Sequence, residues 1–113
     1  MERFKVKLRV KPQFFVSTLV LFYMPRCPWC IQFEPVFLEC AEKWKRAVGL
    51  RVAAVDGTDD RSREKMRQMG IVIEGYPTLM YFDRHGTKYR MKGERTVRNV
   101  NKFIEYCLQR DVL

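Results

Sequence analysis

The stretch that decides the fold is "FYMPRCPWCIQFEP", residues 22 to 35, in which two cysteines are separated by a proline and a tryptophan. Before it, residues 14 to 23 are almost all β-branched or aromatic, the pattern of a strand buried on both faces. After it, apolar residues recur at helical spacing: Phe33, Phe37, Cys40, Ala41, Trp44 and Val48. We therefore expect a helix from Cys27 to about Val48, with the cysteine pair in its first turn.

The rest of the chain predicts further strands and helices. We expect a half-exposed strand at 3–10, a buried strand at 50–56, a short polar helix at 61–69, a hairpin of strands 78–82 and 87–91, and a last helix at 96–109. A helix between two buried strands implies parallel pairing, whereas the hairpin is antiparallel. The order predicts an α/β fold with a mixed sheet covered by helices, in a single domain over residues 1–113.

The chain is basic, with 22 Lys and Arg against 13 Asp and Glu, a net charge of +9. A solvated basic surface explains this excess, and an acidic partner, a nucleic acid or an anionic membrane are the alternatives. No RNA-binding aromatic signature accompanies the basic stretches, so a nucleic acid is not expected. The apolar run at 14–24 follows a basic segment as in a signal peptide, but no small-residue cleavage site follows, and it is too short for a membrane span.

The cysteine pair sits where helix physics favours a reactive thiolate. Backbone N–H groups in the first turn lack partners, and the helix dipole is positive there. Arg26 adds a positive charge, and the fixed φ of Pro28 suits the first helical position. These features lower a cysteine pKa. The position therefore predicts that Cys27 attacks a disulfide and that Cys30, one turn deeper, resolves the mixed disulfide.

A structural metal and an ordinary core role are the alternatives for these cysteines. Zinc needs two ligands beyond a C-x-x-C pair. Cys40 lies about 15 Å along the same helix at 1.5 Å per residue, Cys107 lies on an apolar stripe, and His85 lies in a hairpin turn. We therefore expect no metal within the chain, and we expect Cys40 and Cys107 to be core residues.

Together, "FYMPRCPWC" and the "GYPTLMYF" that follows resemble the thioredoxin-like proteins, and in particular the protein disulfide isomerase family. The resemblance covers about residues 17 to 108. It implies a thioredoxin-like fold with a cis-proline at Pro77 facing the cysteines. It further implies that Tyr76, Pro77 and Trp29 contact the substrate and that Arg95 approaches the site and tunes Cys30. No cofactor is expected.

The chain also departs from the family pattern. Leu21 stands six residues before the first cysteine, where the family usually has a buried acid that carries the proton of the resolving cysteine. Arg26 replaces the usual tryptophan, and Ile31 replaces the usual lysine. The Pro-Trp dipeptide is nearer to that of glutaredoxins, but no glutathione-binding pattern is present. Only three residues separate Val10 from Phe14, so the first helix of the fold is expected to be missing or reduced.

The resemblance implies a thiol–disulfide oxidoreductase that acts on protein or peptide disulfides, more as an oxidase or isomerase than as a reductase. The alternatives are a non-catalytic binding or adaptor domain and a glutaredoxin-like reductase. Glutathione or a partner oxidoreductase would complete the cycle. The resemblance points to the secretory pathway, with the cytoplasm as the alternative.

Overall fold

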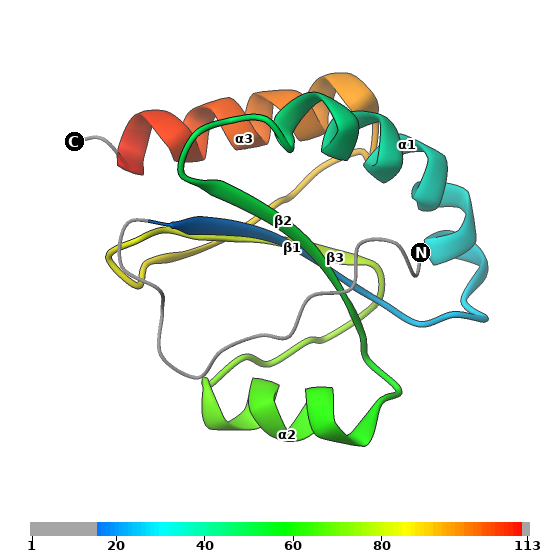
Figure 1. Cartoon of the computed structure of the whole chain (residues 1–113). Helices are drawn as coiled ribbons and strands as arrows, with labels where there is room; N and C mark the ends of the chain where they lie inside the picture. Colours follow the sequence, from blue (N-terminus) through cyan, green and yellow to red (C-terminus); the bar gives the residue numbers. More distant parts are fainter. Residues whose placement is uncertain (1–15, 112–113) are drawn as a thin grey trace.

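A four-stranded mixed sheet lies at the centre of the computed structural model, which describes residues 16–111 (Figure 1). Its strand order is β2-β1-β3-β4, with bounds β1 Ser17–Tyr23, β2 Leu50–Asp56, β3 Thr78–Phe82 and β4 Lys88–Arg90. β1 pairs in parallel with β2 and antiparallel with β3. The expected mixed sheet is thus confirmed, while the strand expected at 3–10 and the shortened segment after it lie outside the described residues.

Helices cover both faces of the sheet (Figure 1). The helices α1, Pro28–Trp44, and α3, Val97–Asp111, lie on one face, and α2, Asp60–Gln68, lies on the other. The strand β1 alternates between two apolar clusters, one under α1 and α3 and one under α2. Leu21 is in the first cluster and Phe22 in the second, and neither is exposed to solvent. Burial of a large apolar side chain stabilises a fold by roughly 1.5–3 kcal/mol, so β1 is the centre of the core.

Most element boundaries follow the sequence pattern, but the end of α1 does not. The bounds of β2 and β3 are those expected, and α1 begins directly after Cys27. However, α1 ends at Trp44, and Val48 is fully exposed rather than part of the apolar stripe. The chain turns after the helix, and Gly49 has a φ of 79°, a left-handed conformation that favours glycine and leads into β2.

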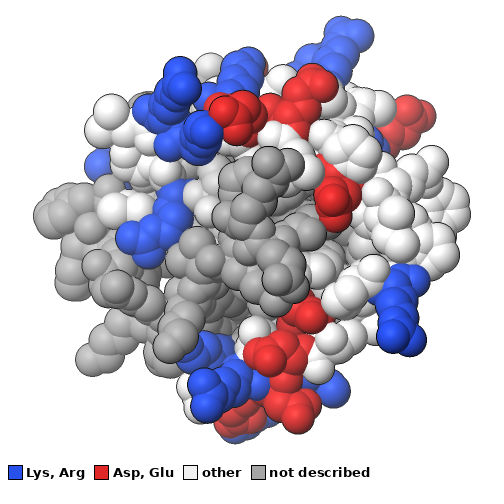
Figure 2. Space-filling model, turned by 45° about the vertical axis from the view of Figure 1, so that its right-hand side comes forward, with Lys and Arg blue, Asp and Glu red and all other residues white. Residues whose placement is uncertain are grey.

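Basic side chains are spread among acidic ones on the face shown in Figure 2. Lys and Arg stand there in separate groups with Asp and Glu between them. Two ion pairs between neighbours on a helix or at its end are also present: Arg67 on α2 contacts Glu64 at 2.6 Å, and Lys45 contacts Glu42 at 2.7 Å. Such exposed pairs contribute about 0–1 kcal/mol each. The basic stretch on α2 is therefore partly neutralised by its own helix.

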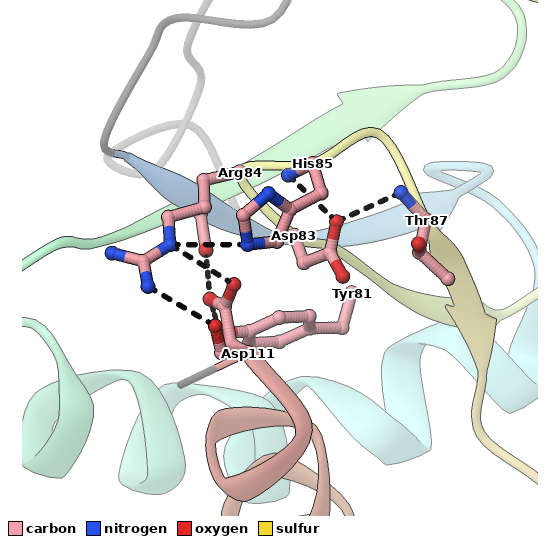
Figure 3. Close-up of polar contacts among 7 residues, drawn as sticks. Tyr81, Asp83, Arg84, His85, Thr87 and Asp111 are labelled. Atoms are coloured by element: carbon pink, nitrogen blue, oxygen red, sulfur yellow. Dashed lines mark hydrogen bonds and ion pairs between the residues drawn. The ribbon is translucent and has the colours of Figure 1, made fainter. Parts of the chain in front are cut away.

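A buried polar cluster joins the last turn of α3 to the sheet (Figure 3). The Asp111 carboxylate is 6% exposed, and its Oδ2 accepts hydrogen bonds from the Ser17 hydroxyl and, at 2.9 Å, from the Tyr81 hydroxyl. Arg84, in the turn after β3, donates to the Asp111 backbone oxygen at 3.2 Å. Its Nε lies 3.7 Å from Oδ1, an ion-pair distance too long for a hydrogen bond. This cluster ties the start of β1 to the end of α3.

Candidate redox site

Cys27 occupies the N-cap of α1. Its backbone is extended, with φ −77° and ψ 121°, and its carbonyl accepts the first helical hydrogen bond, from the N–H of Ile31 at 3.0 Å. Pro28 follows as the first helical residue, as expected, where the missing N–H leaves no orphan donor. The half-exposed Cys27 thiol therefore lies beside the free N–H groups of the first turn.

These surroundings stabilise the thiolate of Cys27. The pKa of Cys27 is lowered mainly by hydrogen bonds from the Cys30 backbone and thiol; burial opposes this, and the Trp29 N–H and the charge of Arg95 add smaller lowering effects. The neighbouring charge among these effects is that of Arg95, which precedes α3. The resemblance implied that Arg95 tunes Cys30, and that role stays a prediction. Arg26 is exposed, and its tuning role stays a prediction.

Cys30 has the opposite environment. It is 1% exposed and packs in the apolar cluster with Leu21 and Phe33. The pKa of Cys30 is raised to about 11, mainly by burial and in part by the neighbouring Cys27. One thiol of the pair is therefore accessible with a lowered pKa, while the other is buried with a raised pKa, which suits the predicted order of attack and resolution.

The segment before β3 faces Cys27 from the opposite side of the site. The Tyr76–Pro77 peptide bond is cis, as the resemblance implied. The Cys27 thiol donates to the Tyr76 carbonyl oxygen with a sulfur–oxygen distance of 3.8 Å. The Tyr76 ring rests on Gly57, where any Cβ would overlap the ring atoms. The glycine therefore lets Tyr76 pack closely, and this packing helps to hold the backbone beside the reactive sulfur.

Trp29 projects next to the pair and borders an open groove. The indole is 61% exposed, and the Arg95 guanidinium lies 5.9 Å from its ring centre, within cation–π range. The groove measures about 620 Å³ and is lined by Trp29, Gln32, Phe33, Val36, Gly93, Glu94, Arg95 and Thr96. The structure thus brings Trp29 and Arg95 together beside Cys27, and the substrate-binding role of Trp29 stays a prediction.

A second, smaller cavity lies on the other side of Cys30. It measures about 120 Å³, and its lining includes Cys30, Glu34 of α1 and Asp56 at the end of β2. Reasoning from the sequence missed both carboxylates. Glu34 could have been found from its spacing, because a residue four positions after Cys30 shares its helix face. Asp56 could not, since only the pairing of β1 with β2 brings it to the site.

The remaining cysteines and the histidine lie away from the pair. Cys40 and Cys107 are buried free thiols, as expected of core residues, and burial raises the pKa of Cys40 to about 11 and that of Cys107 to about 12. His85 is exposed in the turn between β3 and β4. Among residues 16–111, no group of three or more His, Cys, Asp or Glu side chains is arranged to hold a metal ion.

A sequence model of the family described as thioredoxin matches residues 2–106. Human protein disulfide-isomerase A4 is 34% identical over 93 residues, which cover 79% of this chain and 14% of that protein. Mouse protein disulfide-isomerase A5 is 30% identical over 95 residues, which cover 84% of this chain and 18% of that protein. The chain thus spans less than a fifth of the length of these curated relatives.

Two solved structures show the same arrangement of elements. The J-Trx1 fragment of ERdj5 superposes with a TM-score of 0.72 at 25% identity, covering 88% of this chain and 45% of that one. The first thioredoxin domain of mouse protein disulfide-isomerase A4 gives a TM-score of 0.64 at 25% identity, covering 80% and 61%.

Proposed function

The chain belongs to the thioredoxin family, and from that premise we propose that it is a thiol–disulfide oxidoreductase acting on protein or peptide disulfides through Cys27 and Cys30. Its relatives include proteins named protein disulfide-isomerase. One observation carries the proposal: an accessible Cys27 thiol at a helix N-terminus lies 3.8 Å from the carbonyl that precedes the cis-proline. We propose that residues 1–113 act as one thioredoxin-like unit.

The first chemical step is attack by Cys27. Its thiolate displaces one sulfur of a substrate disulfide, which leaves as a thiolate and takes a proton, and a mixed disulfide with Cys27 forms. The backbone at Tyr76 supplies hydrogen-bonding groups to the bound chain, in the manner of an added strand. Trp29 and the adjoining groove receive a neighbouring side chain of the substrate.

The second step is resolution by Cys30. Its thiolate attacks the Cys27 sulfur, the second substrate sulfur leaves, and a Cys27–Cys30 disulfide forms. Two electrons have then passed from the protein to the substrate, and the reverse sequence oxidises a substrate dithiol. Glutathione or a partner oxidoreductase would restore the starting state.

The low pKa of Cys27 favours the oxidising direction. Thiolate stabilisation favours the reduced protein, which makes its disulfide easier to reduce. Each pKa unit corresponds to about 1.4 kcal/mol, or about 30 mV for a two-electron couple. We therefore propose oxidase or isomerase activity over reduction, in an oxidising compartment such as the secretory pathway, where disulfides persist.

A redox titration tests the proposal. The chain is equilibrated in glutathione buffers, alkylated, and weighed by mass spectrometry, with Cys27→Ser as the test variant and Cys40→Ala as a matched control on the same helix. We expect a two-electron transition that Cys27→Ser abolishes and Cys40→Ala retains, with a potential nearer −180 mV than the roughly −270 mV of thioredoxin. Thiols that stay reduced in every buffer would contradict the proposal.

A binding or adaptor domain is the second candidate, and the apolar surroundings of Cys30 favour it. A pKa of about 11 next to Leu21 makes resolution slow unless a base assists. An adaptor would bind extended peptides in the groove with Cys27 alkylated or replaced by serine. An oxidoreductase would trap a substrate as a mixed disulfide in a Cys30→Ser variant. A glutaredoxin-like reductase would be trapped by the Cys30→Ser variant only with glutathione mixed disulfides as substrates.

Nucleic acids and membranes are not part of the proposal. The basic groups on the face in Figure 2 are interrupted by acidic side chains. In the described part of the chain, no helix is both long enough and apolar enough to cross a bilayer.

A further inference from the structure

We propose that Glu34 accepts the proton of the Cys30 thiol, through water in the cavity between them, when Cys30 resolves the mixed disulfide. This inference rests on the proposed oxidoreductase function. The apolar burial of Cys30 makes its attack on the mixed disulfide difficult, and Glu34 would assist this attack.

Cys30 needs a base because its own surroundings oppose ionisation. The side chain is 1% exposed, and Leu21, which is fully buried, packs in the same cluster. Burial raises the pKa of Cys30 to about 11, so only about one thiol in 10⁴ would be ionised at pH 7. A nucleophile present at that level slows resolution in proportion, unless the proton leaves during the attack.

Glu34 is placed to receive that proton. It follows Cys30 by four residues on α1, so the two side chains lie on one face of the helix. Long helical side chains lean toward the helix N-terminus, which directs the Glu34 carboxylate back over Cys30. Both residues border the cavity of about 120 Å³, a volume sufficient for several water molecules. The side chains of Glu34 and Cys30 therefore border the same cavity, and water in this cavity can connect them.

Asp56 is the other carboxylate of this cavity. Its Oδ1 accepts hydrogen bonds from the Thr58 N–H at 2.8 Å and the Thr58 hydroxyl at 2.6 Å. These bonds hold the group at the turn between β2 and α2. We assign the proton transfer to Glu34 because it shares a helix face with Cys30, and Asp56 serves as the competing residue in the test.

Three other groups shift the pKa of Cys30. A hydrogen bond with the Met24 backbone and the charge of Arg95 lower it, and the neighbouring Cys27 raises it. In the mixed disulfide the Cys27 charge is gone, which makes the proton easier to remove. Tyr76 is a weaker acid than a free tyrosine because burial raises its pKa, so its hydroxyl stays neutral at pH 7.

The step is balanced as follows. The Cys30 proton passes to the Glu34 carboxylate through water, and the Cys30 sulfur attacks the Cys27 sulfur. The Cys27–Cys30 bond forms as the bond from Cys27 to the substrate breaks, and the substrate leaves as a thiolate. Glu34 then returns the proton to solvent, from which the leaving thiolate is protonated.

The test separates the two sulfur attacks in time. The reduced chain of residues 1–113 is mixed with the aromatic disulfide DTNB in a stopped-flow instrument. Attack by Cys27 releases a first coloured thiolate, and attack by Cys30 releases a second. The variants are Glu34→Gln, Glu34→Asp, Asp56→Asn and, as a matched control, Glu39→Gln, which removes the same charge from an exposed position of α1.

We expect Glu34→Gln to slow the second release at least about tenfold at pH 7, since a positioned base contributes roughly 10²–10⁴-fold. The first release keeps its rate, which also shows that the variant is folded. The second release in Glu34→Gln then rises about tenfold per pH unit, because only hydroxide removes the proton. Glu34→Asp recovers part of the rate, Asp56→Asn slows the second release less than Glu34→Gln does, and Glu39→Gln behaves as the wild type.

Other results overturn the inference. A second release within about twofold of the wild type in Glu34→Gln excludes Glu34, and loss in Asp56→Asn alone assigns the step to Asp56. If Glu39→Gln slows the second release as much as Glu34→Gln does, the effect comes from the net charge of the helix and not from a base at Glu34. If the wild type gives no Cys27-dependent first release, the proposed function itself fails and the inference falls with it. The first release therefore distinguishes the two failures.

Discussion

Removal of the Asp111 carboxylate should destabilise the protein strongly while sparing the redox site. In Asp111→Ala, the hydroxyls of Ser17 and Tyr81 lose the oxygen that both donate to. A buried donor left without an acceptor costs about 1–3 kcal/mol, so the two together cost about 2–6 kcal/mol. A domain of this size is stable by about 5–15 kcal/mol, so the loss is a large fraction. The melting temperature should fall by at least about 10 °C.

Two further variants measure how much each partner of Asp111 contributes to this loss in the free energy of unfolding. Tyr81→Phe removes one donor and leaves Asp111 bonded to Ser17, for which we expect a loss of about 1.5–3 kcal/mol. Arg84→Gln removes an ion pair whose arginine side chain is 40% exposed and whose charged atoms are 3.7 Å apart, together with the hydrogen bond to the Asp111 backbone oxygen. Exposed pairs contribute about 0–1 kcal/mol and a hydrogen bond about 0.5–1.5 kcal/mol, so this variant should lose less free energy of unfolding than Asp111→Ala.

Urea unfolding followed by tryptophan fluorescence measures these free energies, and the DTNB reaction measures the redox site in the same samples. Six residue steps of β1 separate Ser17 from Tyr23, about 20 Å at 3.3 Å per residue, so the rate of Cys27 should not change. A free energy of unfolding for Asp111→Ala within about 0.5 kcal/mol of the wild type would refute the reasoning. So would a loss in Arg84→Gln as large as that in Asp111→Ala.

Three further predictions concern the site. The rate of Cys27 alkylation should rise with pH through a midpoint below that of a free cysteine, because the pKa of Cys27 is lowered. The Arg95→Gln variant should move this midpoint to higher pH, since loss of the positive charge disfavours the thiolate. In Cys27→Ser, the rate at which iodoacetamide modifies Cys30 should keep rising toward pH 11, and a plateau near pH 8 would contradict the raised pKa. Gly57→Ala should displace Tyr76 and slow the reduction of a peptide disulfide several-fold, while iodoacetamide alkylation of Cys27 stays within about twofold of the wild type; equal slowing of both reactions would show that the change reaches Cys27 itself.

The sheet could be predicted from the sequence because its pattern is local. An uninterrupted run such as 50–56 fits a strand with both faces buried, and the bounds of β2 follow. The start of α1 was also predictable, since Pro28 and the periodic apolar residues mark a helix N-terminus. The end of α1 was not, because Val48 continues the helical period although the chain has already turned toward Gly49.

The less predictable parts of the site depend on contacts between distant segments. The roles of Cys27 and Cys30 could be proposed from helix position and spacing alone. By contrast, Asp56 reaches the cavity only because β2 pairs with β1, and Asp111 meets Ser17 across 94 residues. The burial of Asp111 could not be predicted from the sequence pattern, because a charged residue at the end of a helix is usually solvated.

The contact between Ser17 and Asp111 also has a topological consequence. It places the first residue of β1 and the last residue of α3 side by side, at the end of β1 away from Tyr23 and the cysteines. A protein fused behind α3 would therefore be attached at the end of the sheet away from the cysteines, where it would leave access to Cys27 open.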